Sequence, residues 1–423
     1  MNKYSSFVFE GFNFDQPTKT LTLKYGFDDT LHFEEKLTFN FDFVKYNQDV
    51  LDRAILILYY LAGVSYYKAY STDAIIINHG RLDKPTANFM SEVYQKGLGE
   101  YFYINKLDPK TEIPFVSNSH NLNPLIHDSN KGSLIGLGGG KDSLVTVELL
   151  KHLPNTATWS LGHGEQMSPL VEKIGLPHFS VERQIDPLLL ELNNTDALNG
   201  HIPISAIFSA VGTAVAVLAG YQDVVVSNEN SSNEATLTYD QVDINHQYSK
   251  SLAYEKMYQS LLMQNFGDSL RYYSFLRPLS EVRISEIFSK IAFDKYKDVF
   301  SSCNRAFVQD SHGMSWCGKC SKCAFTFLAL TPFIDRFELE QLWGKNLLLD
   351  DTLNITYENL LGLSGDKPLD CVGEIKESRQ AMKMAQKIYP KLYYQFQIPA
   401  DYNYTDLAVH SMPVDKYKML VLS

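Results

Sequence analysis

Apolar and polar residues alternate along the first 45 residues, in the stretches SFVFEGFNFD, TKTLTLKYGF and EKLTFNFDF. This period of two predicts strands with one buried face. From Asp49 the run VLDRAILILYYLAGVSYYKAY has the wide apolar face of a helix, and the strand candidate DAIIIN follows it. A second helix is expected around TANFMSEVYQKGLGEYFYI. Residues 1–125 are therefore expected to form an N-terminal α+β domain, which ends in a linker rich in Pro and Asn.

From Lys131 onward, strand-like and helix-like stretches alternate. The strand candidates are SLIGLGGG, TATWSLGH, HFSVERQI, DVVVSNE and SLRYYSFLRPL, with helical stretches such as KDSLVTVELLKHL between them. This alternation predicts an α/β domain over residues 131–345, in which a parallel sheet carries helices on both faces. Residues 346–423 are expected to form a mainly helical extension. Ligands of such sheets bind beyond the carboxyl ends of the strands.

One stretch has the composition of a membrane span, because residues 202–221 carry no charged side chain. It contains Pro203, Gly212 and Gly220, however, and it leads directly into the strand candidate DVVVS. A helix buried between the layers of an α/β protein explains this pattern better than a membrane helix. We therefore expect no membrane partner.

Composition and charge narrow the class of protein. Hydrophobic residues make up 45% of the 423 residues, as in a folded globular protein. The formal charge of −11 argues against a nucleic-acid partner, while a few local cations would suffice for a small anionic substrate. The N-terminal MNKYSSFVFEGFNFD has no apolar signal-peptide core, and five cysteines, an odd number, fit a reducing cytoplasm.

A glycine-rich segment, Gly136–Ser143, lies between a predicted strand and a predicted helix. Glycines let the backbone approach phosphate oxygens, and the helix start offers unpaired N–H groups to an anion. Asp142 breaks the Walker A pattern, and Lys141 stands where the dinucleotide fingerprint requires a glycine. The segment resembles the PP-loop of ATP pyrophosphatases, S-G-G-x-D-S, with Gly138 in place of the first Ser. Such enzymes cleave ATP between the α and β phosphates and adenylate a substrate oxygen. The alternative is a glycine-rich turn without a ligand.

Four of the five cysteines are grouped as Cys303-x13-Cys317-x2-Cys320-x2-Cys323. Such spacing lets a tight turn present several thiolates to a tetrahedral ion, which favours a structural zinc site. An iron–sulfur cluster and ordinary reduced cysteines are the alternatives, although the Cys-Pro continuation of ferredoxins is missing after Cys323. A similar arrangement is found in the PP-loop enzyme that makes the nitrile of 7-cyano-7-deazaguanine. That similarity supports zinc and keeps nitrile or amide synthesis open.

Ten stretches across most of the chain are similar to one family, the ATP-dependent UDP-N-acetylmuramoyl-L-alanyl-L-glutamate epimerases, MurL. They are GVSYYKA (63–69), GLGEYFYIN (97–105), GGGKDS (138–143), NGHIP (199–203), SNENSS (227–232), NHQYSKSLAYE (245–255), RPLSE (277–281), SSCNR (301–305), WCGKCSKC (316–323) and KPLDCVGE (367–374). The resemblance implies a reaction that uses ATP and Mg²⁺ to convert the terminal L-Glu of UDP-MurNAc-L-Ala-L-Glu to D-Glu. AMP and pyrophosphate are released, and the product serves peptidoglycan precursor synthesis.

Candidate binding residues follow from this resemblance. Gly138, Gly139, Gly140, Lys141 and Ser143 are expected to hold phosphates, while Asp142 would orient Mg²⁺ or cap the helix. Asn228, Glu229 and Ser231 follow a predicted strand and are expected to bind Mg²⁺ or substrate. Lys250, Arg277 and Arg305 are cations suited to pyrophosphate or carboxylate recognition. The alternative for each charged residue is an ordinary solvated or salt-bridged side chain.

Candidate catalytic residues lie in two of the stretches. Cys371 stands outside the cysteine cluster, a thiolate can abstract an α-proton, and Lys367 could lower the thiol pKa. Glu374 follows in the same stretch, and His201 opens the long apolar helix as a candidate proton carrier. The ordinary alternatives are a free buried cysteine and a histidine bonded to backbone at a helix end.

Two other activities remain open on the sequence. A PP-loop ligase, or a nitrile or amide synthase, would use the same loop and cysteines to adenylate a small carboxylate. A non-catalytic nucleotide sensor would not need the polar stretches SNENSS, NHQYSK and KPLDCVGE.

Overall fold

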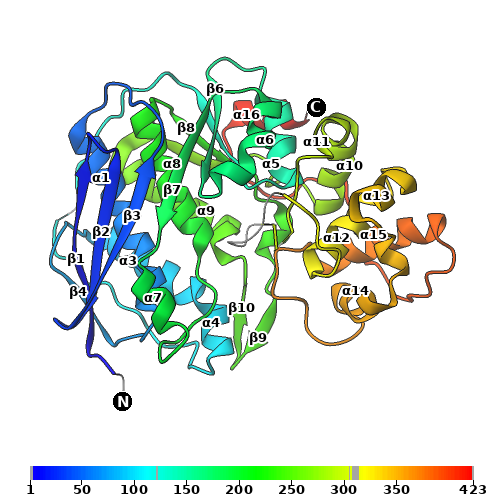
Figure 1. The fold of residues 1–423 in the computed structure, drawn as a ribbon, viewed down its shortest axis with the longest axis horizontal. Helices are drawn as coiled ribbons and strands as arrows, with labels where there is room; N and C mark the ends of the chain where they lie inside the picture. Colours follow the sequence, from blue (N-terminus) through cyan, green and yellow to red (C-terminus); the bar gives the residue numbers. More distant parts are fainter. Residues whose placement is uncertain (1–2, 121, 304, 307–313, 422–423) are drawn as a thin grey trace.

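The computed structural model describes residues 3–120, 122–303, 305–306 and 314–421. Within these ranges, nine strands form one mixed sheet in the order β11-β8-β5-β6-β7-β3-β2-β1-β4 (Figure 1). The strands of this sheet are β1 (Ser6–Asp15), β2 (Thr20–Phe27), β3 (Leu31–Phe39), β4 (Ala74–Ile77), β5 (Ser133–Gly136), β6 (Thr156–Leu161), β7 (His178–Gln184), β8 (Asp223–Val226) and β11 (Arg271–Ser274). A separate hairpin consists of β9 (Leu237–Tyr239) and β10 (Val242–Ile244).

Five neighbouring strands, β11, β8, β5, β6 and β7, pair in parallel. Helices link them along the chain, so the predicted α/β architecture is confirmed. The helices are α1 (Gln48–Ala62), α2 (Val64–Tyr67), α3 (Lys84–Gly97), α4 (Gly99–Ile104), α5 (Lys141–Leu150), α6 (Gly164–Ile174), α7 (Pro187–Leu192), α8 (Ile204–Ala219), α9 (Leu252–Phe266), α10 (Glu281–Ile291), α11 (Phe293–Tyr296), α12 (Ser321–Leu330), α13 (Arg336–Trp343), α14 (Asn354–Leu360), α15 (Ile375–Ile388) and α16 (Val414–Val421). Among the 3₁₀ turns, η1 (Asn230–Asn233) and η2 (Tyr248–Lys250) matter for the site.

The strands of the front section continue the sheet of the parallel strands. β1, β2 and β3 form an antiparallel meander, and β3 pairs antiparallel with β7. β4 lies at the far edge, parallel to β1. The alternating stretches at the N-terminus are thus strands as predicted, but they do not form a sheet of their own. A domain boundary at residue 125 stays a prediction, as do the boundaries at residues 131, 345 and 346.

Two hydrophobic cores cover the two faces of the parallel strands. Neighbouring residues on β5 point to opposite faces, with Leu134 in one core and Ile135 in the other. The first core receives apolar side chains from α1, α8 and α9, and the second receives them from α5, α6, α10 and α12. Helices α13, α14 and α15 lie beside the sheet, at the right of Figure 1, where α14 and α15 contact α12, whereas α16 lies near α6.

The apolar stretch at residues 202–221 forms the core helix α8. Its residues from Ser209 to Ala219 are all buried, which confirms the expectation of a helix between layers. A different segment, Gln48–Tyr67, is long and apolar enough to cross a membrane, but 83% of its apolar window is buried inside the protein. Both helices pack against each other in the first core.

A buried ion pair lies where the antiparallel front strands meet the parallel strands. Arg183 on β7 donates to both oxygens of the Glu35 carboxylate on β3, at 2.8 and 3.0 Å, and to the hydroxyl of Ser65 at 2.8 Å. The Glu35 side chain is fully buried. Two parallel hydrogen bonds between charged groups are geometrically demanding, so this pair fixes the β3–β7 register.

Replacing Glu35 with Ala is expected to destabilise the protein by about 3–5 kcal/mol, because Arg183 would remain as an uncompensated buried charge. Urea unfolding followed by circular dichroism measures this change. Glu34→Ala is the matched control, since the neighbouring Glu34 pairs with Lys24 at a side chain that is 50% exposed. Such a pair contributes about 0–1 kcal/mol. Equal losses in both variants would contradict the role given to Glu35.

Candidate active site

A cavity of about 470 Å³ lies where the parallel strands β5 and β8 end. This is the edge at which sheets of this kind bind ligands. Most of the lining residues belong to the glycine loop, the segment after β8, and the starts of α8, α10 and α12; single residues come from β11, η2 and the segment before α15, and two come from residues 302–303. The lining residues are Gly136, Gly138, Gly140, Lys141, Asp142, Ser143, Ile204, Ser205, Phe208, Val226, Ser227, Asn228, Glu229, Lys250, Tyr272, Glu281, Ser302, Cys303, Lys322, Phe325, Thr326 and Cys371.

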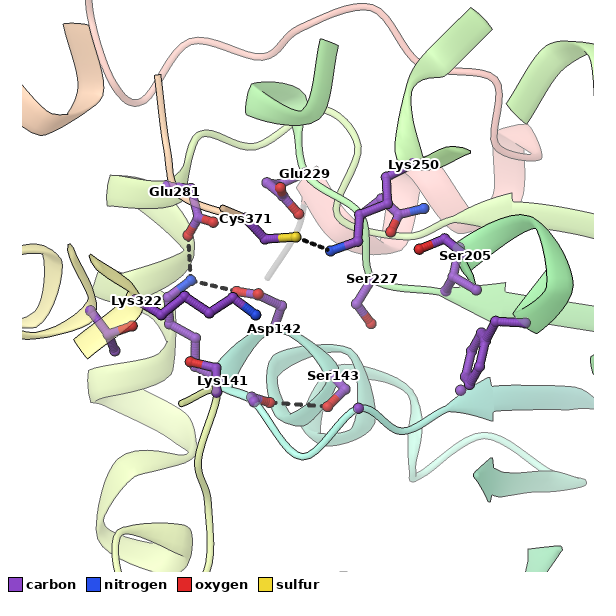
Figure 2. Close-up of a pocket in the computed structure, with 18 of the residues that line it drawn as sticks. Lys141, Asp142, Ser143, Ser205, Ser227, Glu229, Lys250, Glu281, Lys322 and Cys371 are labelled. Atoms are coloured by element: carbon purple, nitrogen blue, oxygen red, sulfur yellow. Dashed lines mark hydrogen bonds and ion pairs between the residues drawn. The ribbon is translucent and has the colours of Figure 1, made fainter. Parts of the chain in front are cut away.

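The glycine loop connects the end of β5 to the start of α5 at the floor of this cavity. Gly139 has a φ of +79°, which favours glycine, and a side chain at Gly138 would meet no atom within 4 Å. The hydroxyl of Ser143 donates to the Gly140 carbonyl at 3.0 Å, as Figure 2 shows. The first N–H groups of α5 lack partners within the helix, so the loop can receive an anion.

Three carboxylates and one lysine gather on one side of the loop. Oxygens of Asp142, Glu229 and Glu281 lie within 4.8 Å of one another. The buried ammonium of Lys141 contacts Asp142 Oδ1 at 2.5 Å and also pairs with Glu281 (Figure 2). Burial raises the pKa of Glu281, and the nearby carboxylates of Asp142 and Glu229 raise it further, while Lys141 opposes them. The cluster thus carries more negative charge than Lys141 balances, and carboxylate oxygens suit a hard cation.

Arg277 lies beneath the cavity and is fully buried. It pairs with the Glu255 carboxylate and donates to the carbonyls of Glu229 and Lys250, at 2.7 and 2.5 Å, and to the Ser232 hydroxyl at 2.7 Å. The two carbonyls belong to residues whose side chains line the cavity. The contact of Arg277 with phosphate therefore stays a prediction, and the structure gives this residue a supporting position.

Cys371 and Lys250 face each other across the upper part of the cavity in Figure 2. The Lys250 ammonium lies 3.3 Å from the Cys371 sulfur. Burial raises the pKa of Cys371, but the positive charge of Lys250, a hydrogen bond from His246 and the charge of Lys322 outweigh burial and lower it to about 6. The group is therefore a thiolate at neutral pH, which is the reactive form of cysteine.

The two histidines near this thiolate differ in charge. Burial lowers the pKa of His246, but bonds to Cys371 and Glu100 outweigh this effect and raise it to about 9. The His201 ring lies 4.2 Å from the His246 ring, centroid to centroid. Burial and the charge of His246 lower the pKa of His201 to about 4, so this ring is neutral. A neutral His201 can accept a proton from a strong acid only, and its role as a proton carrier stays a prediction.

The other predicted residues lie outside the cavity lining. Lys367 pairs with Glu234 at 2.6 Å, and Glu374 caps the start of α15. Ser231 donates to the Glu229 carboxylate at 3.2 Å from beneath the cavity. Arg305 is exposed, and its backbone N–H donates to the sulfur of Cys303 at 3.4 Å. The binding or catalytic roles expected of these four residues stay predictions.

The four clustered cysteines are free thiols, and their sulfurs all lie within 4.8 Å of one another. The sulfurs of Cys303 and Cys320 are 3.9 Å apart, and those of Cys317 and Cys323 are 3.8 Å apart. Metal–sulfur bonds of about 2.3 Å in a tetrahedron require sulfurs about 3.8 Å apart. The cluster can therefore hold one metal ion. Cys320 also caps α12, which presents Lys322, Phe325 and Thr326 to the cavity.

Sequence reasoning missed four residues of this site, Glu281, Lys322, His246 and Glu100. Each lies in one of the stretches that resemble the MurL family, but other residues of the same stretch drew attention first. Glu281 closes RPLSE behind Arg277, and Lys322 stands between two cysteines of WCGKCSKC. Their importance comes from their distances in the folded chain, for which the sequence carries no local signal.

Two family models match this chain. One, described as the MurL N-terminal domain, matches residues 1–275, and the other, described as the MurL C-terminal domain, matches residues 299–391. The chain is also similar to curated relatives named UDP-N-acetyl-alpha-D-muramoyl-L-alanyl-L-glutamate epimerase. The relative from Xanthomonas oryzae pv. oryzae is 37% identical over 90% of this chain and 86% of its own length. The relatives from Micromonospora sp. and Salinispora tropica are 37% and 35% identical, over 79% and 91% of this chain and 75% and 85% of their own lengths.

The N-terminal model covers more than half of the chain, and each of these relatives is covered over at least three quarters of its length. The resemblance drawn from ten short stretches is thereby confirmed over most of the chain. The chain belongs to the MurL family of epimerases.

Proposed function

We propose that this protein inverts the terminal L-Glu of UDP-MurNAc-L-Ala-L-Glu to D-Glu, and that it does so through an acyl-adenylate made from ATP. The relatives' names supply the substrate. One observation carries the mechanism: a glycine loop at a helix start and a cysteine of lowered pKa line the same cavity. The free thiols fit a reducing compartment such as the cytoplasm.

Adenylation solves the main chemical difficulty of this reaction. Removing the α-proton next to a free carboxylate would create an enolate with a second negative charge. When the carboxylate oxygen attacks the α-phosphate of ATP, pyrophosphate leaves and the carbonyl becomes an electron sink. The α-proton then becomes acidic enough for a side chain to remove, and hydrolysis after inversion releases AMP.

The glycine loop is the proposed site for the phosphates, in the manner of a PP-loop. Gly138 and Gly140 line the cavity, Gly139 lies between them, and a side chain at Gly138 would meet no atom within 4 Å. The α5 helix start contributes the favourable end of its dipole. Ser143 and Lys141 complete the predicted set. The Lys141 ammonium pairs with the carboxylates of Asp142 and Glu281, so it could contact a phosphate only while it also contacts these carboxylates.

Asp142, Glu229 and Glu281 are the residues we propose to hold Mg²⁺. Their oxygens converge, and the pKa of Glu281 is raised first by burial and then by the charges of Asp142 and Glu229, which a cation would neutralise. When bound there, Mg²⁺ would neutralise phosphate charge during cleavage of ATP. Asn228 lines the same side of the cavity and can add a carbonyl oxygen.

Cys371 is the proposed base for the α-proton. Its thiolate faces Lys250, and Lys322 adds a second positive charge on the cavity wall. Both cations would also stabilise the negative charge that develops on the substrate carbonyl during deprotonation. A proton delivered to the opposite face of the carbanion then gives D-Glu.

Zinc is the metal we propose for the four-cysteine cluster. The sulfur–sulfur distances of 3.8 and 3.9 Å fit a single tetrahedral ion, whereas an iron–sulfur cluster would distribute the four cysteines over two or four irons. Zinc there would be structural, because four thiolates leave no position for substrate. It would fix the start of α12 and so the placement of Lys322 in the cavity.

The test of the proposed function uses ATP, Mg²⁺ and UDP-MurNAc-L-Ala-L-Glu, with AMP and the glutamate configuration followed together. The wild type is expected to release AMP and form D-Glu. Cys371→Ala should lower inversion by about 10²–10⁴-fold, the usual effect of losing a general base, while AMP release continues. Asp366→Asn, an exposed change in the same segment, should leave both activities intact.

Three outcomes would contradict the proposal in different ways. AMP release by the wild type without inversion would favour a ligase or a nitrile or amide synthase. No substrate-dependent AMP would remove the adenylation step. Undiminished inversion by Cys371→Ala would remove Cys371 from the mechanism and leave the overall reaction standing.

Cys320→Ser is expected to lower bound zinc from one equivalent per chain to nearly none, measured by elemental analysis of the purified protein. The melting temperature should fall as well, because structural zinc contributes directly to folding. Cys371→Ala is the matched control and should keep its zinc, since Cys371 lies outside the cluster. Several iron atoms per chain with visible absorbance would contradict the assignment.

A further inference from the structure

A line of three side chains leads from the cavity into the front section of the protein. Cys371 precedes α15, His246 follows β10, and Glu100 lies on α4. On one side, the His246 ring lies close enough to Cys371 for the two groups to shift each other's pKa, upward for the imidazole and downward for the thiol. Its Nδ1 atom bonds to the Glu100 carboxylate on the other. The side chains of His246 and Glu100 are only 11% and 10% exposed, so water screens this pair little.

The surroundings of the line alternate in charge. Two cations lie beside Cys371, Lys250 from η2 and Lys322 from α12. His201 and the Glu100 carboxylate lie beside His246. The carboxylates of Glu229 and Asp142 lie beside Lys250. His201 is held by a hydrogen bond to the His246 backbone, and its ring is neutral. The thiolate thus meets cations, and the imidazolium meets a carboxylate. Each charge in this line has an opposite partner.

His246 has no free side for another role. An imidazolium donates through both nitrogens, and this ring already has partners in Cys371 and Glu100. A metal ion held by Glu100, His201 and His246, whose ligand atoms lie within 4.8 Å of one another, would have to replace the bond to Glu100. The observed bonds therefore favour proton chemistry at this place over metal binding.

We propose that His246 and Glu100 are positioning residues for the proposed base, in which Glu100 orients and charges His246, and His246 keeps Cys371 an anion aimed into the cavity. The proposal rests on the proposed function only in using Cys371 as that base. In the step itself, a sulfur lone pair takes the α-proton and the C–H electron pair enters the enolate. His246 keeps its own proton throughout.

The pH range of the ion pair follows from the two shifts. The pKa of Cys371 is lowered to about 6, so the thiolate is lost as the pH falls through 6. The pKa of His246 is raised to about 9, so its charge is lost as the pH rises through 9. The thiolate–imidazolium pair is thus present between these limits.

The test measures the thiolate directly, without substrate or ATP. The full-length protein is alkylated with iodoacetamide over a series of pH values, and the Cys371 peptide is quantified by mass spectrometry. The midpoint in the wild type is expected near pH 6. In His246→Gln it should rise by about one to two pH units, since a charged hydrogen-bond donor is lost. It should stay below the value of an ordinary thiol, because Lys250 and Lys322 remain.

Glu100→Gln should move the midpoint in the same direction by a smaller amount, because it weakens the charge on His246 without removing the ring. His152→Gln is the matched control, since His152 is exposed on the chain after α5. Circular dichroism and melting temperature establish that each variant is folded. If His246→Gln does not fold, His246→Asn takes its place in the comparison.

An unchanged midpoint in folded His246→Gln would overturn the proposal. A metal ion that the wild type holds in addition to any ion on the cysteine cluster, and that His246→Gln loses, would overturn it as well. The alkylation result does not depend on epimerisation. A shifted midpoint in a protein that fails to invert the substrate would therefore contradict the proposed function and leave the effect of His246 on the Cys371 thiol standing.

The activity of the variants separates positioning from general damage. In His246→Gln, the acidic limb of the pH–rate profile for inversion should move upward with the thiol midpoint, while AMP formation keeps its own profile. At pH values above the new midpoint, part of the lost inversion rate should return. A structural defect would instead lower both rates at every pH.

Discussion

The guanidinium of Arg277 holds the two loops that carry Glu229 and Lys250 into the cavity. It is completely buried, its charge is balanced by Glu255, and its remaining donors reach the backbone of both loops and the hydroxyl of Ser232. A buried cation must satisfy its donors, so the loops cannot shift apart without leaving it unpaired. The placement of one carboxylate and one ammonium in the site thus depends on a residue that does not line it.

That placement separates two kinds of charge within one cavity. On one side, three carboxylates surround Lys141 and suit a divalent cation. On the other, Lys250, Lys322 and His246 surround the Cys371 sulfur. In the proposed mechanism, the first arrangement serves phosphate chemistry, and the second keeps a thiolate anionic beside an anionic substrate. The thiol precedes α15, whereas His246 and Glu100 lie in the N-terminal family domain, so the proposed base and its positioning residues come from both halves of the chain.

The features that the sequence predicted correctly each depend on residues close together in the chain. The alternating front strands, the glycine loop between β5 and α5, the cysteine spacing and the buried helix α8 can each be recognised within about twenty residues. The missed parts depend on distant contacts. The pairing of β3 with β7 joins the front section to the parallel strands, and His246 meets Glu100 across 146 positions. Arg277 shows the same limit: its charge suggested a ligand contact, whereas its burial is decided by packing.

In the proposed mechanism, proton removal follows adenylation at one site, and solvent deuterium exchange can establish this order. The enzyme is incubated in D₂O with UDP-MurNAc-L-Ala-L-Glu and Mg²⁺, with ATP or with an analogue that cannot be cleaved between the α and β phosphates. Mass spectrometry then measures deuterium at the glutamate α-carbon. The proposed order predicts that deuterium enters the α-carbon with ATP but not with the analogue or without nucleotide. Incorporation without cleavage of ATP would contradict it, because the α-proton would then leave before the carboxylate is activated.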